Sequence, residues 1–205
     1  FEEKFNKPYS LIPKNIKFYN ILGNHDYDIK QSPKSQINYS KLNKKWVLPH
    51  NFYCFKKMIN KIPIEFMGID TNFSKMSKNN KNIQEKWIIN TLYDSNARWN
   101  IIFSHHPWEN YGKEKSCSDE LDLFYNKICS TKKIDLIISS FDNSQQHIFI
   151  PNKPNMIISG VGGKVGEKNT SIPNLKLHQE LKYFSKNLGC VLIEFHKQFL
   201  KIKFY

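Results

Sequence analysis

The sequence predicts an α/β fold, built as a single domain over residues 1–205. In the first two thirds of the chain, apolar runs of strand length alternate with amphipathic helical segments. Several β-like segments then follow one another, which indicates a sheet that gains antiparallel strands late in the chain. Polar residues also follow the ends of expected strands, where open α/β sheets build their sites. These residues are Asn24, Asp70, His105 and Asp142.

The first half of the chain contains the elements that alternate between strand and helix. A charged amphipathic segment opens it, and a run of alternating polarity ends at Gly23. Apolar residues at helical spacing around Trp87 predict an amphipathic helix. The expected elements are a helix end at 1–7, a strand at 16–22, a loop and short helix at 34–45, strands at 52–57 and 64–69, a loop at 72–82, a helix at 83–95 and a strand at 99–103.

The second half contains one helix and then mostly strands. Asp119 and Glu120 lie in the first turn of the expected helix, where negative charge is favourable against the helix dipole. The expected elements are a helix at 118–130, strands at 134–139, 147–150, 156–159, 190–195 and 199–205, a turn at 160–166 and a loop at 164–186.

The formal net charge of +13 raises the question of nucleic-acid binding. Nearly all of the positive charge is Lys, because Arg98 is the single Arg of the chain. Proteins that read bases favour the planar guanidinium of Arg. We therefore expect Lys on solvated faces and no nucleic-acid partner. No apolar run approaches the about 20 residues that cross a bilayer, so no transmembrane segment is predicted.

The cysteines and the first residues bear on the compartment. The spacing of Cys54, Cys117, Cys129 and Cys190 contains no C-x-x-C pair, which excludes a zinc knuckle and leaves a disulfide open. Phe1 leads directly into charged residues, so no signal-peptide pattern is visible, and no Met opens the chain. The sequence predicts a fragment or a processed product.

Two short motifs can carry chemistry. In Gly23-Asn24-His25-Asp26, Asn24 can offer a carbonyl oxygen to a cation, and His25 can offer a proton or an imidazole nitrogen. The same four residues also suit an ordinary turn. In His105-His106-Pro107, Pro107 ends the preceding strand. Adjacent side chains on an extended backbone point in different directions, so at most one imidazole faces a given site. A satisfied core histidine is the alternative.

Taken in order along the chain, the motifs resemble those of the calcineurin-like metallophosphoesterases. More narrowly, they resemble the small tartrate-resistant purple acid phosphatases. The resemblance implies an αββα sandwich, of which this chain would be the C-terminal two-thirds without the N-terminal strands. It rests on Gly23–Asp26, Ser35–Trp46 with Pro49 and Tyr53, Ile69–Thr71, Gln84-x-x-Trp87, His105–Pro107, Ile134–Ser140 and Ile158–Gly162.

The resemblance also implies a chemistry. Members of the family hold iron together with iron, zinc or manganese, and the metal pair activates a hydroxide that attacks a phosphate ester. Carried over by motif, Asn24 and His105 fall on metal-ligand positions. His25 falls beside the substrate phosphate, where it can stabilise charge or assist the leaving group. The family is mostly secreted, vacuolar or lumenal, which is the location expected here.

The sequence departs from the family where a Gly-His-Asp-His motif is expected. It reads Ser140-Phe141-Asp142-Asn143 there. Phe141 cannot bind a metal, and Asn143 offers a weak neutral oxygen, which leaves Asp142 as a candidate replacement ligand. The family's N-terminal motifs are also absent. A partial metal site at most is therefore expected, with phosphomonoester hydrolysis impaired or lost. The alternative is a non-catalytic scaffold that binds a protein partner.

The expected disulfide of the family is also in doubt. By the same resemblance, a cysteine near Cys117 pairs with one in the loop that here is 72–82, and this loop contains no cysteine. An oxidising compartment therefore gains no support from a disulfide.

Overall fold

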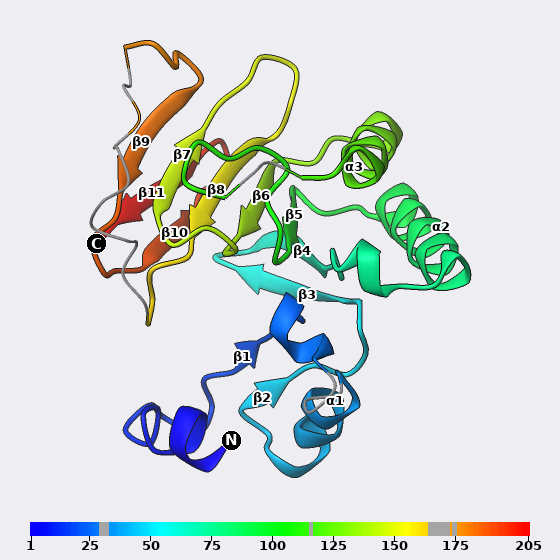
Figure 1. Cartoon of the computed structure of the whole chain (residues 1–205), viewed down its shortest axis with the longest axis vertical. Helices are drawn as coiled ribbons and strands as arrows, with labels where there is room; N and C mark the ends of the chain where they lie inside the picture. The colour runs from blue at the N-terminus through cyan, green and yellow to red at the C-terminus, as the bar shows by residue number, and fades with distance from the viewer. Residues whose placement is uncertain (29–32, 115–116, 164–172, 174–175) are drawn as a thin grey trace.

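The computed structural model describes residues 1–28, 33–114, 117–163, 173 and 176–205. Its centre is a mixed seven-stranded sheet with the strand order β3-β4-β5-β6-β8-β7-β9 (Figure 1). Strands β4, β5, β6 and β8 run parallel, whereas β3 and β7 pair antiparallel with their neighbours. The strands are β3 (Tyr53–Ile59), β4 (Ile62–Gly68), β5 (Trp99–Phe103), β6 (Leu136–Ser139), β7 (Gln145–Ile148), β8 (Asn155–Ser159) and β9 (Leu181–Ser185).

Two helices cover one face of this sheet (Figure 1). They are α2 (Lys78–Asp94) and α3 (Asp119–Thr131). Each begins after a serine whose hydroxyl accepts a hydrogen bond from a backbone N–H of the first turn, which satisfies a donor that the helix leaves free. Their apolar sides form the larger core with alternate sheet residues. This core includes Ile88, Leu92, Leu121, Tyr125, Ile102, Ile137, Met156 and Ile158.

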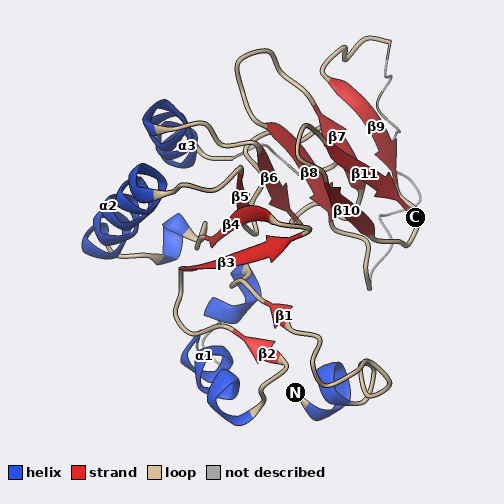
Figure 2. Cartoon of the chain, turned by 180° about the vertical axis from the view of Figure 1, so that it is seen from behind, coloured by secondary structure: helices blue, strands red, loops and turns tan. Residues whose placement is uncertain are grey.

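A β-hairpin covers the opposite face, as Figure 2 shows from behind. It consists of β10 (Val191–Phe195) and β11 (Leu200–Phe204). Successive strand residues point to opposite faces, so Ile101 packs toward the hairpin while Ile102 packs toward the helices. The second core lies between sheet and hairpin and includes Ile62, Ile64, Trp99, Ile101, Leu136, Ile157 and Phe195.

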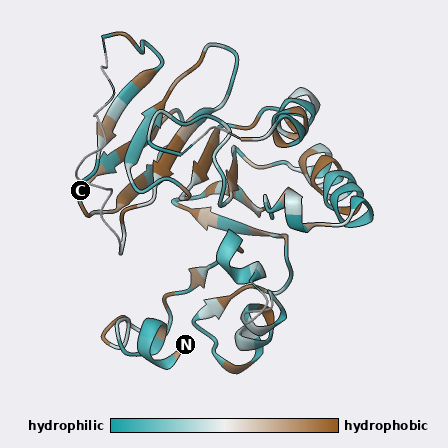
Figure 3. Cartoon of the chain, in the orientation of Figure 1, coloured by the Kyte–Doolittle hydropathy of each residue, from teal (hydrophilic) through white to brown (hydrophobic). Residues whose placement is uncertain are grey.

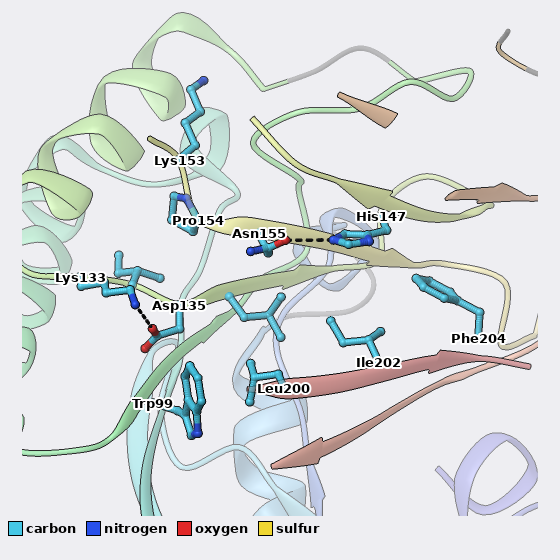
Figure 4. Close-up of a pocket in the computed structure, with 12 residues that line it drawn as sticks. Trp99, Lys133, Asp135, His147, Lys153, Pro154, Asn155, Leu200, Ile202 and Phe204 are labelled. Atoms are coloured by element: carbon cyan, nitrogen blue, oxygen red, sulfur yellow. Dashed lines mark hydrogen bonds and ion pairs between the residues drawn. The ribbon is translucent and has the colours of Figure 1, made fainter. Parts of the chain in front are cut away.

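A groove of about 460 Å³ opens along β11 between the hairpin and the sheet. Apolar side chains, which include Trp99, Leu200, Ile202 and Phe204, line it together with polar ones (Figure 4). Four of its polar residues form two pairs: Lys133 forms an ion pair with Asp135 at 3.1 Å, and His147 Nε2 lies 2.9 Å from Asn155 Oδ1.

The N-terminal residues form a smaller unit beside the edge strand β3 (Figures 1 and 2). Strands β1 and β2 pair in parallel, and a third core around Leu22, Leu48 and Tyr53 joins this unit to the sheet. The elements here are the π-helix η1 (Glu2–Asn6), β1 (Phe18–Tyr19), the 3₁₀ helix η2 (Asn24–Tyr27), α1 (Pro33–Leu42) and β2 (Trp46–Val47). A further 3₁₀ helix, η3 (Phe73–Lys75), precedes α2.

The predicted α/β class with helices, sheet and further strands in layers is confirmed. In Figure 3 the central strands are largely hydrophobic, as the apolar runs indicate. Three local predictions are wrong. The expected loop 72–82 ends early, because Ser77 caps α2 and its first residues are exposed, which removes the periodic apolar signal. The strand at 16–22 shortens to β1, which pairs with a strand of two residues.

The third error is in the expected loop 164–186, which contains β9. This strand forms by pairing with β7, a partner that lies far away in the sequence. Residues 164–172 and 174–175 of that loop, and part of the predicted turn 160–166, lie outside the described residues. No described helix is long and apolar enough to cross a membrane.

Candidate functional site

The candidate residues come together at the carboxyl ends of β4, β5 and β6. These parallel neighbours end at Gly68, Phe103 and Ser139, so the segments that follow them meet at one edge of the sheet. The backbone N–H groups of Ser140 and Phe141 both donate to the carbonyl oxygen of His105, at 3.2 and 3.0 Å. The turn that carries Phe141 is therefore fixed directly against the histidine.

Asn24 and His105 contact each other across 81 residues of sequence. Asn24 Oδ1 lies 3.0 Å from His105 Nε2. Gly23 makes room for this contact, because a Cβ added there would lie 3.3 Å from the imidazole. Burial, with smaller contributions from His106 and His25, lowers the pKa of His105 to about 4. The imidazole is therefore neutral at pH 7, and the two atoms with ligand character are bonded to each other.

The turn around Asn24 is held by Asp26. Its carboxylate accepts from the backbone N–H of Gly23 at 2.8 Å and from Gln36 Nε2 at 2.7 Å. Burial raises the pKa of Asp26 above its ordinary value. The hydrogen bonds of Asp26 hold the turn in place, and within this turn Asn24 faces His105.

A buried polar network lies beneath the motif and centres on Asp70. One carboxylate oxygen accepts from the Tyr27 hydroxyl and lies 3.4 Å from Asn51 Nδ2. The other accepts from the backbone N–H and the side-chain amide of Asn72, at 3.0 and 2.8 Å. Gln84 of α2 exchanges two hydrogen bonds with the Asp70 backbone. This network connects η2, β4 and α2, so it fixes the position of the motif.

Phe141 packs against both histidines. Its ring centroid lies 5.2 Å from that of His105 and 4.7 Å from that of His106. His106 turns toward Thr71, whose hydroxyl oxygen lies 3.0 Å from Nδ1. A hollow of about 540 Å³ opens beside Phe141 and His106 and extends to the start of α3 at Ser118. The ring of Phe141 therefore lies beside both imidazoles, at one side of this hollow.

The remaining candidates point elsewhere. The His25 side chain is 88% exposed and lies 3.2 Å from the Asp28 carboxylate. The buried Asp142 carboxylate accepts from the backbone N–H of Glu114 at 3.1 Å and from the Ser144 hydroxyl. Its hydrogen bonds therefore hold the loop after Pro107. Asn143 is half-buried in the turn after Phe141.

Sequence reasoning did not include the network around Asp70 as part of the site. Tyr27, Asn51 and Asn72 are ordinary turn or loop residues by type, and their role comes from burial and from partners distant in sequence. Asp70 itself carried a signal, because it follows an apolar strand.

The comparison with family models decides the family. A model described as calcineurin-like phosphoesterase matches residues 1–140. The chain belongs to this family. The fold and the order of the motifs agree with that assignment, and the predicted family resemblance is confirmed.

The curated relatives of this calcineurin-like phosphoesterase are purple acid phosphatases. Purple acid phosphatase 7 of Arabidopsis thaliana is 26% identical over 183 residues, which cover 80% of this chain and 54% of the relative. Purple acid phosphatase 17 of the same plant is 23% identical and covers 100% of this chain and 64% of the relative. The chain therefore spans 54% to 64% of the length of these two proteins.

Two solved structures share the fold. One is titled "GAP50 the anchor in the inner membrane complex of Plasmodium", with a TM-score of 0.80 at 20% identity, covering 99% of this chain and 66% of that chain. The other is the purple acid phosphatase PPD1 from yellow lupin (Lupinus luteus), with a TM-score of 0.58 at 12% identity, covering 93% of this chain and 36% of that chain. At these identities the similarity shows the fold alone.

The described residues do not fit the two-metal centre of the family. Among them, no group of three or more His, Cys, Asp or Glu side chains lies together as a metal-binding set. Around His105 the neighbours are the amide of Asn24 and the ring of Phe141. One imidazole and one amide cannot balance the charge of two metal cations, since affinity depends on the full set of ligands.

All four cysteines are free thiols in the structure. Burial raises the pKa of Cys117 to about 12, and nearby Asp122 adds to this. Burial also raises the pKa of Cys129 to about 12. Both half-buried thiols are therefore protonated at neutral pH.

Proposed function

We propose that this chain is a purple-acid-phosphatase-like domain in which phosphomonoester hydrolysis is impaired or lost. The observation that carries the proposal is Phe141, whose ring packs on His105 and His106 where the family resemblance places a metal-binding histidine. An aromatic ring supplies no lone pair to a metal. Hydrolysis by a metal-bound hydroxide needs both a ligand and a water there.

The roles of the remaining residues follow from the same proposal. Asn24 and His105 retain ligand character and can support at most a partial metal site. Asn143 stands in for a second histidine with a neutral amide, and Asp142 holds the neighbouring loop. His25, which the family resemblance places beside the substrate phosphate, is exposed and lies against Asp28. Residues 1–205 act as one domain in a secreted, vacuolar or lumenal setting.

The second candidate function is a non-catalytic scaffold that binds a protein partner. The observation in its favour is the fold shared with GAP50, which its title describes as the anchor in the inner membrane complex of Plasmodium. A phosphoesterase fold can therefore serve assembly. The packing of Phe141 on both histidines is compatible with such a role, because a scaffold needs no open metal site.

The decisive experiment measures metal content and turnover on the whole protein that contains this chain. We expect less than one bound iron, zinc or manganese ion per chain and no p-nitrophenyl phosphate hydrolysis above background. Two bound metals with turnover in the unmodified protein would contradict the proposal.

Restoring the histidines separates the two candidate functions. We expect Phe141→His/Asn143→His to raise the metal content. The variant should also hydrolyse p-nitrophenyl phosphate if the loss of these two ligands is the main cause of inactivity. Phe149→His/Asn152→His is the matched control, because it adds two histidines at exposed positions away from the site. A restored protein that binds metal and still lacks turnover would favour the scaffold.

A further inference from the structure

The N-terminal part of the chain carries most of the net positive charge, because it contains few acidic residues. Residues 1–61 contain twelve Lys, no Arg and four Asp or Glu, so their net charge is +8 of the chain's +13. The four acidic residues all have local partners. Glu2 bonds Asn6, Glu3 bonds Lys7, Asp26 holds the Gly23 turn, and Asp28 faces His25. Four carboxylates cannot balance twelve lysines within this part of the chain.

Three of these lysines line one hollow. Lys17, Lys41 and Lys44 surround a space of about 360 Å³ against β2. The other described residues that line it are uncharged: Ile37, Ser40, Trp46, Val47, Leu48 and Pro49. The floor is thus apolar and the rim is basic, which is an arrangement suited to a group that combines negative charge with hydrocarbon.

The backbone brings the surrounding segments side by side. Lys17 Nζ donates to the carbonyl oxygen of Lys44 at 2.6 Å, and the N–H of Phe18 donates to Lys45 at 2.8 Å. Lys45 Nζ in turn donates to the carbonyl oxygens of residues 9 and 12, which closes the turn between them. Residues 9–18 and 41–46 therefore form one continuous surface at the end of the molecule away from α2 and α3 (Figure 1).

Large apolar side chains of these same segments are exposed. Leu11 is 96% exposed and Leu42 is 82% exposed, while Ile16 is 48% exposed. Leu11 and Ile16 belong to the segment 9–18, which also contains Lys17. Leu42 belongs to the segment 41–46, which also contains the other two lysines of the hollow. We call Leu11, Ile16, Lys17, Lys41, Leu42 and Lys44 the basic–apolar patch.

We infer that the basic–apolar patch binds the surface of an anionic lipid membrane. Leucines that are almost fully exposed to water gain free energy on entering the interface between headgroups and acyl chains. Lysines beside them then lie level with the negative headgroups, with their aliphatic stems along the apolar floor. The patch supplies both contributions that peripheral membrane binding needs, apolar burial and charge attraction. Membrane binding through this patch does not depend on the catalytic state of the site.

The patch fits a lipid surface better than other polyanions. Nucleic-acid readers use Arg, and the patch contains Lys alone. An acidic protein surface would pair with the lysines but would leave exposed leucines without a matching hydrocarbon phase.

Vesicle co-sedimentation of the whole chain tests membrane binding by the basic–apolar patch. We expect binding to phosphatidylcholine vesicles that contain phosphatidylserine, little binding to pure phosphatidylcholine, and weaker binding as salt rises. Lys17→Gln/Lys41→Gln/Lys44→Gln should weaken binding roughly 100-fold, at about fivefold per lysine. Leu11→Ser/Leu42→Ser keeps the charge and should weaken it at least about tenfold.

The matched control removes the same charge elsewhere. Lys78→Gln/Lys86→Gln/Lys197→Gln changes three exposed lysines outside the patch and should bind within roughly threefold of the unmodified chain. Thermal melting checks that every variant is folded. Absence of binding to phosphatidylserine vesicles, an equal loss in the control, or full binding by the leucine variant would each overturn the inference.

Discussion

At the scale of single residues, Phe141 and Gly160 define the turn beside the histidines. Gly160 follows β8, and its N–H donates to the carbonyl oxygen of Ser144 at 2.9 Å. A Cβ on Gly160 would lie 1.7 Å from the carbonyl oxygen of Asp142, the residue after Phe141. The turn that places the phenyl ring on the imidazoles therefore needs a glycine opposite it.

Gly160→Ala should be strongly destabilising. The new methyl group would clash with the backbone of the 140–144 turn, which cannot move without breaking its hydrogen bonds. We therefore expect a loss of about 3 kcal/mol in the free energy of unfolding. Urea unfolding measures this. Gly162→Ala is the control, because no atom lies within 4 Å of its added Cβ. Similar losses in both variants would contradict the packing of Gly160.

At the scale of elements, α3 and the residue before its cap place two half-buried thiols against the larger core. Cys129 lies within the helix, and Cys117 lies directly before its cap Ser118. Burial raises the pKa of both thiols to about 12, compared with about 8.5 in an unfolded chain. Folding therefore favours the protonated thiols.

This difference in pKa predicts a pH dependence of stability. The folded pKa values are raised, so the contribution of the thiols is fully present below about pH 8.5 and is lost as the pH rises toward 12. The free energy of unfolding should fall across this window. Cys117→Ala/Cys129→Ala should make the fall shallower, measured by urea unfolding at several pH values. An unchanged slope in this variant would refute the assignment to the thiols.

At the scale of the whole molecule, the hairpin of β10 and β11 packs on one face of the central sheet. Phe195 of β10 is 8% exposed and packs edge to face with Phe66 of β4, with ring centroids 5.8 Å apart. Leu192 lies on the same strand and is 45% exposed. One strand therefore has a side that closes the second core and a side in solvent.

The two sides of β10 should respond differently to truncation. Phe195→Ala leaves a cavity between hairpin and sheet and should cost roughly 3 kcal/mol of unfolding free energy. Leu192→Ala should change it by less than about 0.5 kcal/mol. Thermal or urea unfolding measures both. Equal effects would show that the hairpin does not contribute its Phe195 side to the core.

The class of the fold and the types of residue at the site can be predicted from the sequence alone. Apolar runs predict strands because burial on both faces demands continuous hydrophobicity, as in Trp99–Phe103, which forms β5 as expected. The replacement of a histidine by Phe141 can likewise be read directly. Edge strand β9 could not be predicted, because its polar alternation is stabilised by pairing with β7.

The tertiary structure decided which of these residues touch. Asn24 and His105 are 81 positions apart, and they meet because parallel pairing of β4, β5 and β6 brings strand ends to one edge, where the N-terminal unit docks. It also decided that Phe141 packs on both imidazoles and that Asp142 turns to the 110–114 loop. Residue chemistry is local and can be read from the sequence, whereas contact between distant residues depends on how the elements pack.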